Sequence, residues 1–247
     1  MTRWNVIFIG LSLLYSSSCK KPENRTCFKT SGDFSERSVF LGAFNRLDLR
    51  ERMQFVLIQD SMNKVVIQGG KNLLNLVEVT ENDGLVTVVN HNRCNFWRNY
   101  AMPTVEIHFT RLINLNFEGT ERLYNQDTLF ADYLTLTLKD GGGTVDLKVK
   151  ALDIKAENTY GWGNMVLRGT TQTLRANLMG DGSFDVEGLH VSNSLKWITV
   201  SSRDQKIRAD GVPLQVQIDG SGNVRYWGNP SSISLNKYGS GVLINCN

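Results

Sequence analysis

Proline, cysteine and histidine are scarce in this sequence, and each shortage narrows the classes of protein to consider. Among 247 residues there are four Pro, four Cys and three His. His91, His108 and His190 lack the close spacing of zinc ligands, so no metal site is predicted. A GxSxG elbow, a phosphate-binding loop and a pair of catalytic carboxylates are also missing. We therefore expect a protein without a cofactor and without enzymatic activity.

The sequence also lacks a strong excess of positive or negative charge. The 27 Lys and Arg residues against 24 Asp and Glu residues give a formal net charge of +3, and the basic residues are dispersed along the chain. Nucleic-acid binding normally uses a clustered basic patch, or aromatic residues interleaved with basic ones where the nucleic acid is single-stranded. Nucleic acid is therefore not among the expected partners.

The sequence has no helical period of useful length, apart from one turn around residues 72–76. It contains 22 Gly, and 41% of its residues are hydrophobic. A chain of this length and composition suits a single β-rich domain with a core of adequate size. Because no linker divides the chain, we expect one continuous β domain over residues 39–247.

Small turn residues recur along the second half of the chain at an interval of about twenty. The steps between the first members of successive turns are 22, 20, 19, 21, 19 and 19 residues. A fixed interval of this size is typical of stacked supersecondary units. The turns are Gly119-Thr120, Gly141-Gly142-Gly143, Gly161-Trp162-Gly163, Gly180-Asp181-Gly182, Ser201-Ser202, Gly220-Ser221-Gly222 and Gly239-Ser240-Gly241.

Apolar and polar residues alternate on both sides of these turns. Val145 and Leu147 follow one turn with Asp146 between them, and Leu214-Gln215-Val216 precedes another. A period of two predicts strands with one buried face. Each unit is therefore a strand, a small turn, a second strand and a further polar break such as Gly169 or Gly188.

Two arrangements of these units compete. Antiparallel hairpins would form a meander with a glycine turn at each hairpin tip. Alternatively, each unit would be one coil of a parallel β-helix, with equivalent positions about 4.8 Å apart. Meander loops usually vary in length, so the constancy of the interval favours an all-β fold that is a parallel β-helix of about 20 residues per coil.

The N-terminus has the design of an export signal. Arg3 precedes an apolar run over residues 4–15, which is too short to span a bilayer as a mature helix, and then come Ser16-Ser17-Ser18-Cys19. Cysteine after small residues resembles a bacterial lipobox, so residues 1–19 are predicted to be a lipoprotein signal peptide with Cys19 acylated. Residues 20–38 would then be a polar tether from the membrane. The alternative is ordinary secretion, with cleavage near Ser18.

Export places the remaining three cysteines in an oxidising compartment. A disulfide between Cys27 and Cys94 would close a loop of roughly seventy residues and contribute about 4 kcal/mol in the loop-entropy model. Cys246 would then stay unpaired. The alternative is that all three are free thiols.

Three stretches resemble the bacterial GIN-domain family, the head domains ascribed to auto-transporter adhesins and common in lipoproteins of the Bacteroidetes. They are Cys27-Phe28-Lys29-Thr30-Ser31-Gly32, Asn92-Arg93-Cys94-Asn95-Phe96-Trp97-Arg98, and Gly220-Ser221-Gly222-Asn223-Val224-Arg225-Tyr226-Trp227-Gly228-Asn229-Pro230 followed by Gly239-Ser240-Gly241.

The resemblance to the family covers residues 44–243, and its closing Gly-Ser-Gly motif is its most specific part. It implies a right-handed, single-stranded β-helix and supports the pairing of Cys27 with Cys94. The family carries no established catalytic residues. Ser201-Ser202-Arg203 replaces the family's usual glycines, which suggests one irregular coil.

Aromatic residues near the turns are the predicted binding residues, since the CH faces of sugars stack on aromatic rings. They are Tyr160, Trp162, Trp227 and Tyr238. The alternative is that these rings cover neighbouring coils. The predicted function is a non-enzymatic, lipid-anchored protein of the cell envelope, at the outer membrane on its periplasmic or surface side. It would be an adhesin that binds a glycan or a protein.

The competing hypothesis is a carbohydrate-active β-helix enzyme of the polysaccharide-lyase kind. It needs charged side chains that converge in one groove. Asp140, Asp181 and Asp219 lie beside the turns but at different offsets from them, so we expect solvated turn residues instead.

Replacing Cys19 by Ala is expected to release the protein from the membrane fraction, because the acyl chains on this residue are the predicted anchor. Mass spectrometry of the mature N-terminal peptide and membrane fractionation measure this. Cys246→Ala serves as the control and should leave the anchor intact. A wild-type N-terminus without an acyl group would favour ordinary secretion instead.

Overall fold

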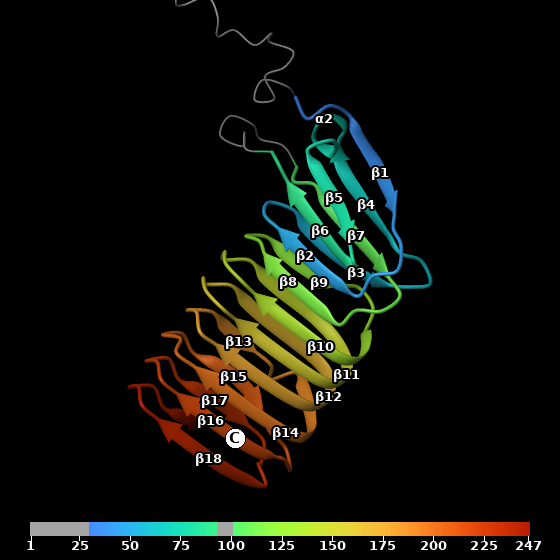
Figure 1. Cartoon of the computed structure of the whole chain (residues 1–247). Helices are drawn as coiled ribbons and strands as arrows, with labels where there is room; N and C mark the ends of the chain where they lie inside the picture. The colour runs from blue at the N-terminus through green and yellow to red at the C-terminus, as the bar shows by residue number, and fades with distance from the viewer. Residues whose placement is uncertain (1–29, 93–100) are drawn as a thin grey trace, which may run out of the picture.

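Backbone hydrogen bonds join the small turns of the repeat one to the next. Trp162 N donates to Gly141 O at 3.0 Å. One turn further along the chain, Asp181 N donates to Gly161 O at 2.9 Å. The turns therefore lie in register along one edge of a stack of rungs, in a computed structural model that describes residues 30–92 and 101–247 (Figure 1).

Strands occupy most of the described residues. They are β1 (Phe34–Phe40), β2 (Arg46–Arg50), β3 (Gln54–Gln59), β4 (Lys64–Gly70), β5 (Val77–Asn82), β6 (Leu85–Asn90), β7 (Thr104–Phe109), β8 (Asn114–Glu118), β9 (Arg122–Asn125), β10 (Leu129–Leu138), β11 (Thr144–Asn158), β12 (Asn164–Leu178), β13 (Ser183–Asp185), β14 (Leu189–Thr199), β15 (Gln205–Arg208), β16 (Pro213–Ile218), β17 (Val224–Trp227), β18 (Ser232–Lys237) and β19 (Leu243–Asn245). The helix α2 spans Lys71–Leu74. Within the described residues no helix is long and apolar enough to cross a bilayer.

The strands form three faces of a solenoid (Figure 1). Along the axis, face A contains β5, β6, β2, β8, the C-terminal parts of β10, β11, β12 and β14, and then β16 and β18. Face B contains β1, β4, β7, β3, β9, the N-terminal parts of β11 and β12, and then β13, β15, β17 and β19. Face C is short and consists of residues 129–131, 149–151, 169–171 and 189–191.

Every strand pairing between β8 and β19 is parallel. Val145 pairs with Leu123 on one side and with Met165 on the other, so equivalent residues lie 22 and 20 positions apart. The right-handed β-helix of about 20 residues per coil is therefore confirmed, with about seven turns. The alternative of a hairpin meander is wrong for this part of the chain.

Inward-facing residues form stacked rows that fill the interior. One row comprises Leu115, Leu136, Ala156, Ala176, Trp197 and Val216, all of which are buried. The rings of Phe184 and Trp197 meet edge to face inside the solenoid, at 6.2 Å between centroids. Burial of apolar surface, worth about 25 cal/mol per Å², is therefore the main term that holds the rungs together.

The N-terminal rungs are not stacked in chain order. β2 lies between β6 and β8, and β3 lies between β7 and β9. The first rung of the chain is thus inserted between two rungs that are formed by later residues. The sequence repeat does not extend to this region, and sequence analysis did not anticipate the insertion.

Antiparallel strands complete the N-terminal end of the solenoid. β1 pairs with β4, and β4 with β7. β5 and β6 form the hairpin that Glu81-Asn82-Asp83-Gly84 predicts, with positive φ at Asp83 and Gly84, as a two-residue hairpin turn requires. β1 begins at Phe34, inside the range 20–38 that was expected to be a tether, so the β structure starts before residue 39.

The C-terminal end is an open edge with polar residues in the last rung. Lys237 pairs with Ile218, and Asn245 pairs with Tyr226, so both stand at positions that are inward-facing in the preceding rung. All of β18 is exposed. A charged residue at an inward position discourages a further strand from adding to an edge.

The serine turn that replaces glycine keeps its place in the stack through Asp181. The carboxylate of Asp181 accepts hydrogen bonds from Ser202 N (2.6 Å), Ser202 Oγ (3.0 Å) and Ser201 Oγ (3.2 Å). The bond from the backbone of Ser202 is the main cause that lowers the pKa of Asp181, followed by the bond from the hydroxyl of the same residue.

Gly161→Ala is expected to destabilise the solenoid, while Gly142→Ala should be nearly neutral. Gly161 has a φ of +81°, and a Cβ there would lie 2.7 Å from Gly141 O, whereas a Cβ on Gly142 meets nothing within 4 Å. A left-handed backbone costs a non-glycine residue about 1–2 kcal/mol before any clash is counted. Urea unfolding of the two variants measures the difference, and equal midpoints would contradict the close approach of the turns.

Asp181→Asn should lower the free energy of unfolding at neutral pH and make it depend less on pH in the acid range. A lowered folded-state pKa contributes stability above the unfolded value, near 3.9, and this stability is lost as the pH falls through the folded pKa. The free energy of unfolding, measured between pH 7 and pH 2, should therefore fall less in the variant than in the wild type. Ser202→Ala removes one donor to the same carboxylate and should show a smaller change of the same sign.

Candidate functional site

Face C exists on four consecutive rungs, where the strands are long enough to form it. β11 and β12 each span 15 residues, whereas β15 and β17 on later rungs span 4. The long strands bend from face C into face A at Asp132, Leu152 and Gln172, where the ladder of paired residues is interrupted. The side chains at these bends are exposed.

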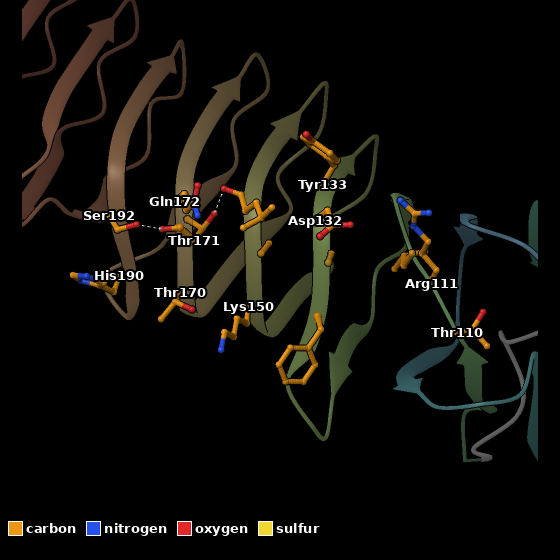
Figure 2. A pocket seen from close by; sticks show the side chains of 15 residues that line it. Thr110, Arg111, Asp132, Tyr133, Lys150, Thr170, Thr171, Gln172, His190 and Ser192 are labelled. Carbon is orange, nitrogen blue, oxygen red and sulfur yellow. Dashed lines mark hydrogen bonds between the residues drawn. The ribbon is translucent and has the colours of Figure 1, made fainter.

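One line of outward side chains runs along face C. Phe130 pairs with Lys150, Lys150 with Thr170, and Thr170 with His190, so successive members lie about 4.8 Å apart along the axis. We call these four residues the Lys150 row. Figure 2 shows Lys150, Thr170 and His190 extending from the same side of their strands.

A second line follows the bends, two residues further along each strand than the first. We call it the Leu152 row, and it consists of Asp132, Leu152, Gln172 and Ser192.

An open groove of about 550 Å³ is lined by both rows. We call it the face C groove. Arg111, in the segment before β8, and Tyr133, at the start of the face A part of β10, also line it (Figure 2). Its apolar walls are accessible to a ligand, since Phe130 is 57% exposed, Tyr133 63% and Leu152 45%.

The floor of the groove is made of small, fully satisfied groups. Ala151 and Thr171 are buried beneath the two rows. The Thr171 hydroxyl lies 3.3 Å from Leu152 O and 3.1 Å from Thr173 O, and Ser192 Oγ donates to Thr171 O at 3.5 Å (Figure 2). The backbone of residues 149–151 and 169–171 is already paired in the parallel ladder, so a ligand above them would contact side chains rather than a free strand edge.

A β-bulge lies at one end of the groove. The register between β12 and β14 shifts between Thr171 and Thr173, because two residues of β14, Ser192 and Asn193, stand opposite Gln172. Bulges redirect side chains and occur frequently beside functional sites. Here the bulge places Ser192 on the groove wall.

The charged side chains of the groove differ from Asp146 on face B, which is paired. On face B, Asp146 is held between Arg122, at 2.6 Å, and Arg168. Burial alone would raise the pKa of Asp146, but the hydrogen bonds from these two arginines outweigh it and lower the pKa. In contrast, within the described part of the chain, Arg111, Lys150 and Asp132 of the groove take part in no ion pair.

A smaller hollow of about 480 Å³ adjoins the groove at His190. Arg168 and Arg208 line it together with Asp185 and Glu187. Its charges are balanced, and Lys206 further pairs with Asp185 at 3.2 Å. It therefore offers no excess charge to a ligand.

Residues 43–230 match the sequence family described as "Putative auto-transporter adhesin, head GIN domain". The chain belongs to this family. No protein in a search of curated proteins matches this GIN domain.

Solved structures have the same fold as this GIN domain. A "putative adhesin" from Bacteroides fragilis aligns with a TM-score of 0.77 at 22% identity, over 87% of this chain and 97% of that one. A "putative lipid binding protein" from Parabacteroides distasonis gives 0.65 at 14% identity, over 87% and 98%. A "putative adhesin" from Parabacteroides merdae gives 0.60 at 17% identity, over 88% and 98%. At these identities the likeness concerns the fold alone.

The four aromatic residues that were predicted to bind a ligand do not form one site in this GIN domain. Tyr160 and Trp162 are exposed in the turn between β11 and β12. Tyr238 lies in an equivalent turn four rungs further on, about 19 Å away along the axis. Trp227 is half-buried at the end of β17, away from the turns.

The turn carboxylates do not converge either. Asp140 accepts a hydrogen bond from Gly141 N (2.7 Å), and Asp219 accepts one from Gln217 Nε2 (2.8 Å). Asp181 accepts its hydrogen bonds from the serine turn, as described above. Over residues 30–92 and 101–247, no group of three His, Cys, Asp or Glu residues is placed to hold a metal ion.

Three of the predicted cysteine positions lie outside the described residues. Cys19, Cys27 and Cys94 fall in the ranges 1–29 and 93–100, so the lipid anchor and the disulfide stay predictions. Cys246 is a free cysteine, and its Sγ lies 3.9 Å from Ile244 O.

The face C groove was missed by sequence analysis although the sequence contains a signal for it. The Lys150 row recurs at intervals of 20 residues, as does the Leu152 row. The glycines and the inward apolar residues of the repeat reveal the fold. The outward residues at the same interval vary in chemistry, and only their stacking shows that they share a surface.

Proposed function

We propose that this GIN domain is the non-enzymatic head of a cell-envelope adhesin, held at the membrane by a lipid on Cys19, and that it binds its ligand in the face C groove. The observation that carries the proposal is the groove itself. It combines exposed apolar rings, free polar side chains and unpaired charges over several rungs, on a rigid β scaffold. Such a mixture of apolar walls with a few polar groups is typical of binding sites.

Binding rather than catalysis is supported by the chemistry of the lining residues. Asp132 is the single carboxylate that lines the groove. Glycoside hydrolysis needs two carboxyl groups on either side of the scissile bond, so this lining does not suit a glycosidase. The turn carboxylates considered for the lyase alternative lie along another edge. The family description supports the adhesin role in the same way.

The orientation of the molecule supports an adhesin head. The described chain begins at the end of the solenoid that carries β1 and α2, and the rungs extend away from that end (Figure 1). A lipid on Cys19 would hold the β1 end towards the membrane. The face C groove, on the rungs of β10 to β14, would then stand clear of the lipid headgroups.

Tyr133→Ala is expected to weaken ligand binding roughly tenfold, or ~1.4 kcal/mol, because the ring forms an exposed apolar wall of the groove. Tyr238→Ala is the matched control, since Tyr238 is 77% exposed but lies outside the groove. The full-length protein in detergent micelles would be applied to a glycan array and to extracellular-matrix proteins.

The two tyrosine variants separate the possible outcomes. Loss of binding in Tyr133→Ala alone supports the groove. Loss of binding in Tyr238→Ala alone would instead place the binding site at the aromatic residues of the turns. Release of unsaturated sugar products from a bound polysaccharide would contradict the non-enzymatic role.

A further inference from the structure

We propose that the face C groove binds a linear anionic polysaccharide that lies along the solenoid axis. This proposal rests on the proposed function, because it names the class of ligand for the same groove. Four observations on the described residues lead to it: the direction of the groove, the unpaired cations, the free polar side chains and the closed backbone of the floor.

The direction of the groove follows from the register of the strands. Arg111 lies one rung before Asp132, since Thr135 N donates to Ile113 O at 2.7 Å. From there the Leu152 row continues over three further rungs to Ser192. Five rungs at about 4.8 Å give a groove about 19 Å long. This length accommodates several sugar units of one extended chain rather than a single compact molecule.

Positive charge in the groove is not neutralised by the protein. Lys150 and Arg111 are exposed, and neither has an ion-pair partner in the described residues, whereas Arg175 on face A pairs with Asp153 at 2.8 Å. Asp132 is the single acidic residue in the lining, so cations outnumber it. Arg and Lys side chains that lack a protein carboxylate are available to a carboxylate or sulfate of a ligand.

Free hydrogen-bonding groups accompany these charges. Thr170 and Gln172 stand on adjacent rows, and neither side chain has a hydrogen-bond partner in the described part of the protein. Figure 2 places both between Lys150 and His190. Together with the rings of Phe130 and Tyr133, they offer hydroxyl-binding and CH-binding groups, the two kinds of contact that a pyranose ring needs.

An extended acidic peptide is the competing ligand, and the groove suits it less well. Peptides that lie along a β structure normally gain affinity by pairing with a free strand edge. On face C, β11 and β12 are paired with a strand on both sides, and the Thr171 hydroxyl lies against the carbonyls of Leu152 and Thr173, at 3.3 and 3.1 Å. A polysaccharide needs no backbone partner.

The test compares polymers that differ only in charge. The full-length protein in detergent micelles is titrated with polygalacturonate and with its fully methyl-esterified form, and with dextran sulfate and with dextran. We expect binding to the charged member of each pair, with a dissociation constant that rises with salt concentration. The carboxylate and sulfate arms show which anionic group is preferred.

Matched variants locate the binding. Lys150→Gln is expected to weaken binding of the preferred polymer several-fold, and Arg111→Gln/Lys150→Gln roughly tenfold, or ~1.4 kcal/mol. Lys196→Gln makes the same charge change at an exposed, unpaired lysine of face A and should leave binding unchanged. Asp132→Asn should strengthen binding, because it removes the groove's acidic group. Circular dichroism of each variant checks folding.

Each remaining outcome overturns the proposal in a recognisable way. Equal binding of neutral and charged polymers, with the Tyr133→Ala effect retained, would reject an anionic ligand but keep the groove as the adhesin site. Equal losses in Lys150→Gln and Lys196→Gln would show non-specific attraction. Competition by poly-glutamate at the same potency would assign the groove to an acidic protein. Binding that is insensitive to both Tyr133→Ala and Lys150→Gln would reject the proposed function as well.

Discussion

The close approach of neighbouring turns is the constraint on which the rest of this structure depends. At Gly161 the carbonyl oxygen of Gly141, in the neighbouring turn, occupies the space that a side chain would need, and the same oxygen accepts a hydrogen bond from Trp162 N. Glycine makes this contact possible, and the contact fixes the height of each rung. Where glycine is absent, at Ser201, the chain keeps the same spacing by means of the hydrogen bonds to Asp181.

A fixed rung height has a consequence for the outer surface. Once the turns are in register, residues about twenty positions apart lie side by side along the axis, whatever their chemistry. The interior rows are filled mainly by apolar residues, because burying apolar surface is favourable. Residues in the outer rows are not buried and need not be apolar. They can therefore differ from one another and still form one wall of a groove, as Phe130, Lys150, Thr170 and His190 do. The scaffold and the site are therefore specified by different residues at the same interval.

The sequence predicted the solenoid because its determinants are local and repeated. Alternation around Val145 and Leu147 gives strands, and the interval between glycines gives the stacking, so both can be seen without knowledge of distant contacts. The hairpin turn at Asp83 and Gly84 was predictable for the same reason. These features need only neighbours in the chain or equivalents one coil away.

The groove and the N-terminal rungs could not be predicted in this way. The groove arises where strands grow to 15 residues and bend at Leu152 and Gln172, and bending at an exposed residue leaves no apolar pattern in the sequence. Exposure of an aromatic side chain also says little about function, since Tyr160 and Tyr238 are exposed but stand rungs apart. The insertion of β2 and β3 depends on pairing with strands that follow up to 70 residues later, as in Val56 with Tyr124, and no local signal encodes that distance.

The inserted rung determines the order in which the chain can assemble. Among the described strands, β3 finds its parallel neighbours in β7 and β9, so this rung cannot close until the chain up to about residue 125 is available. Every later rung needs a partner only about twenty residues back, and closing so short a segment costs little entropy. We therefore expect assembly to have one slow nucleation step that involves the first half of the chain, followed by faster, directional growth. The same strands would act as a mechanical lock under tension, because pulling on the N-terminus loads β2 and β3 against neighbours on both sides.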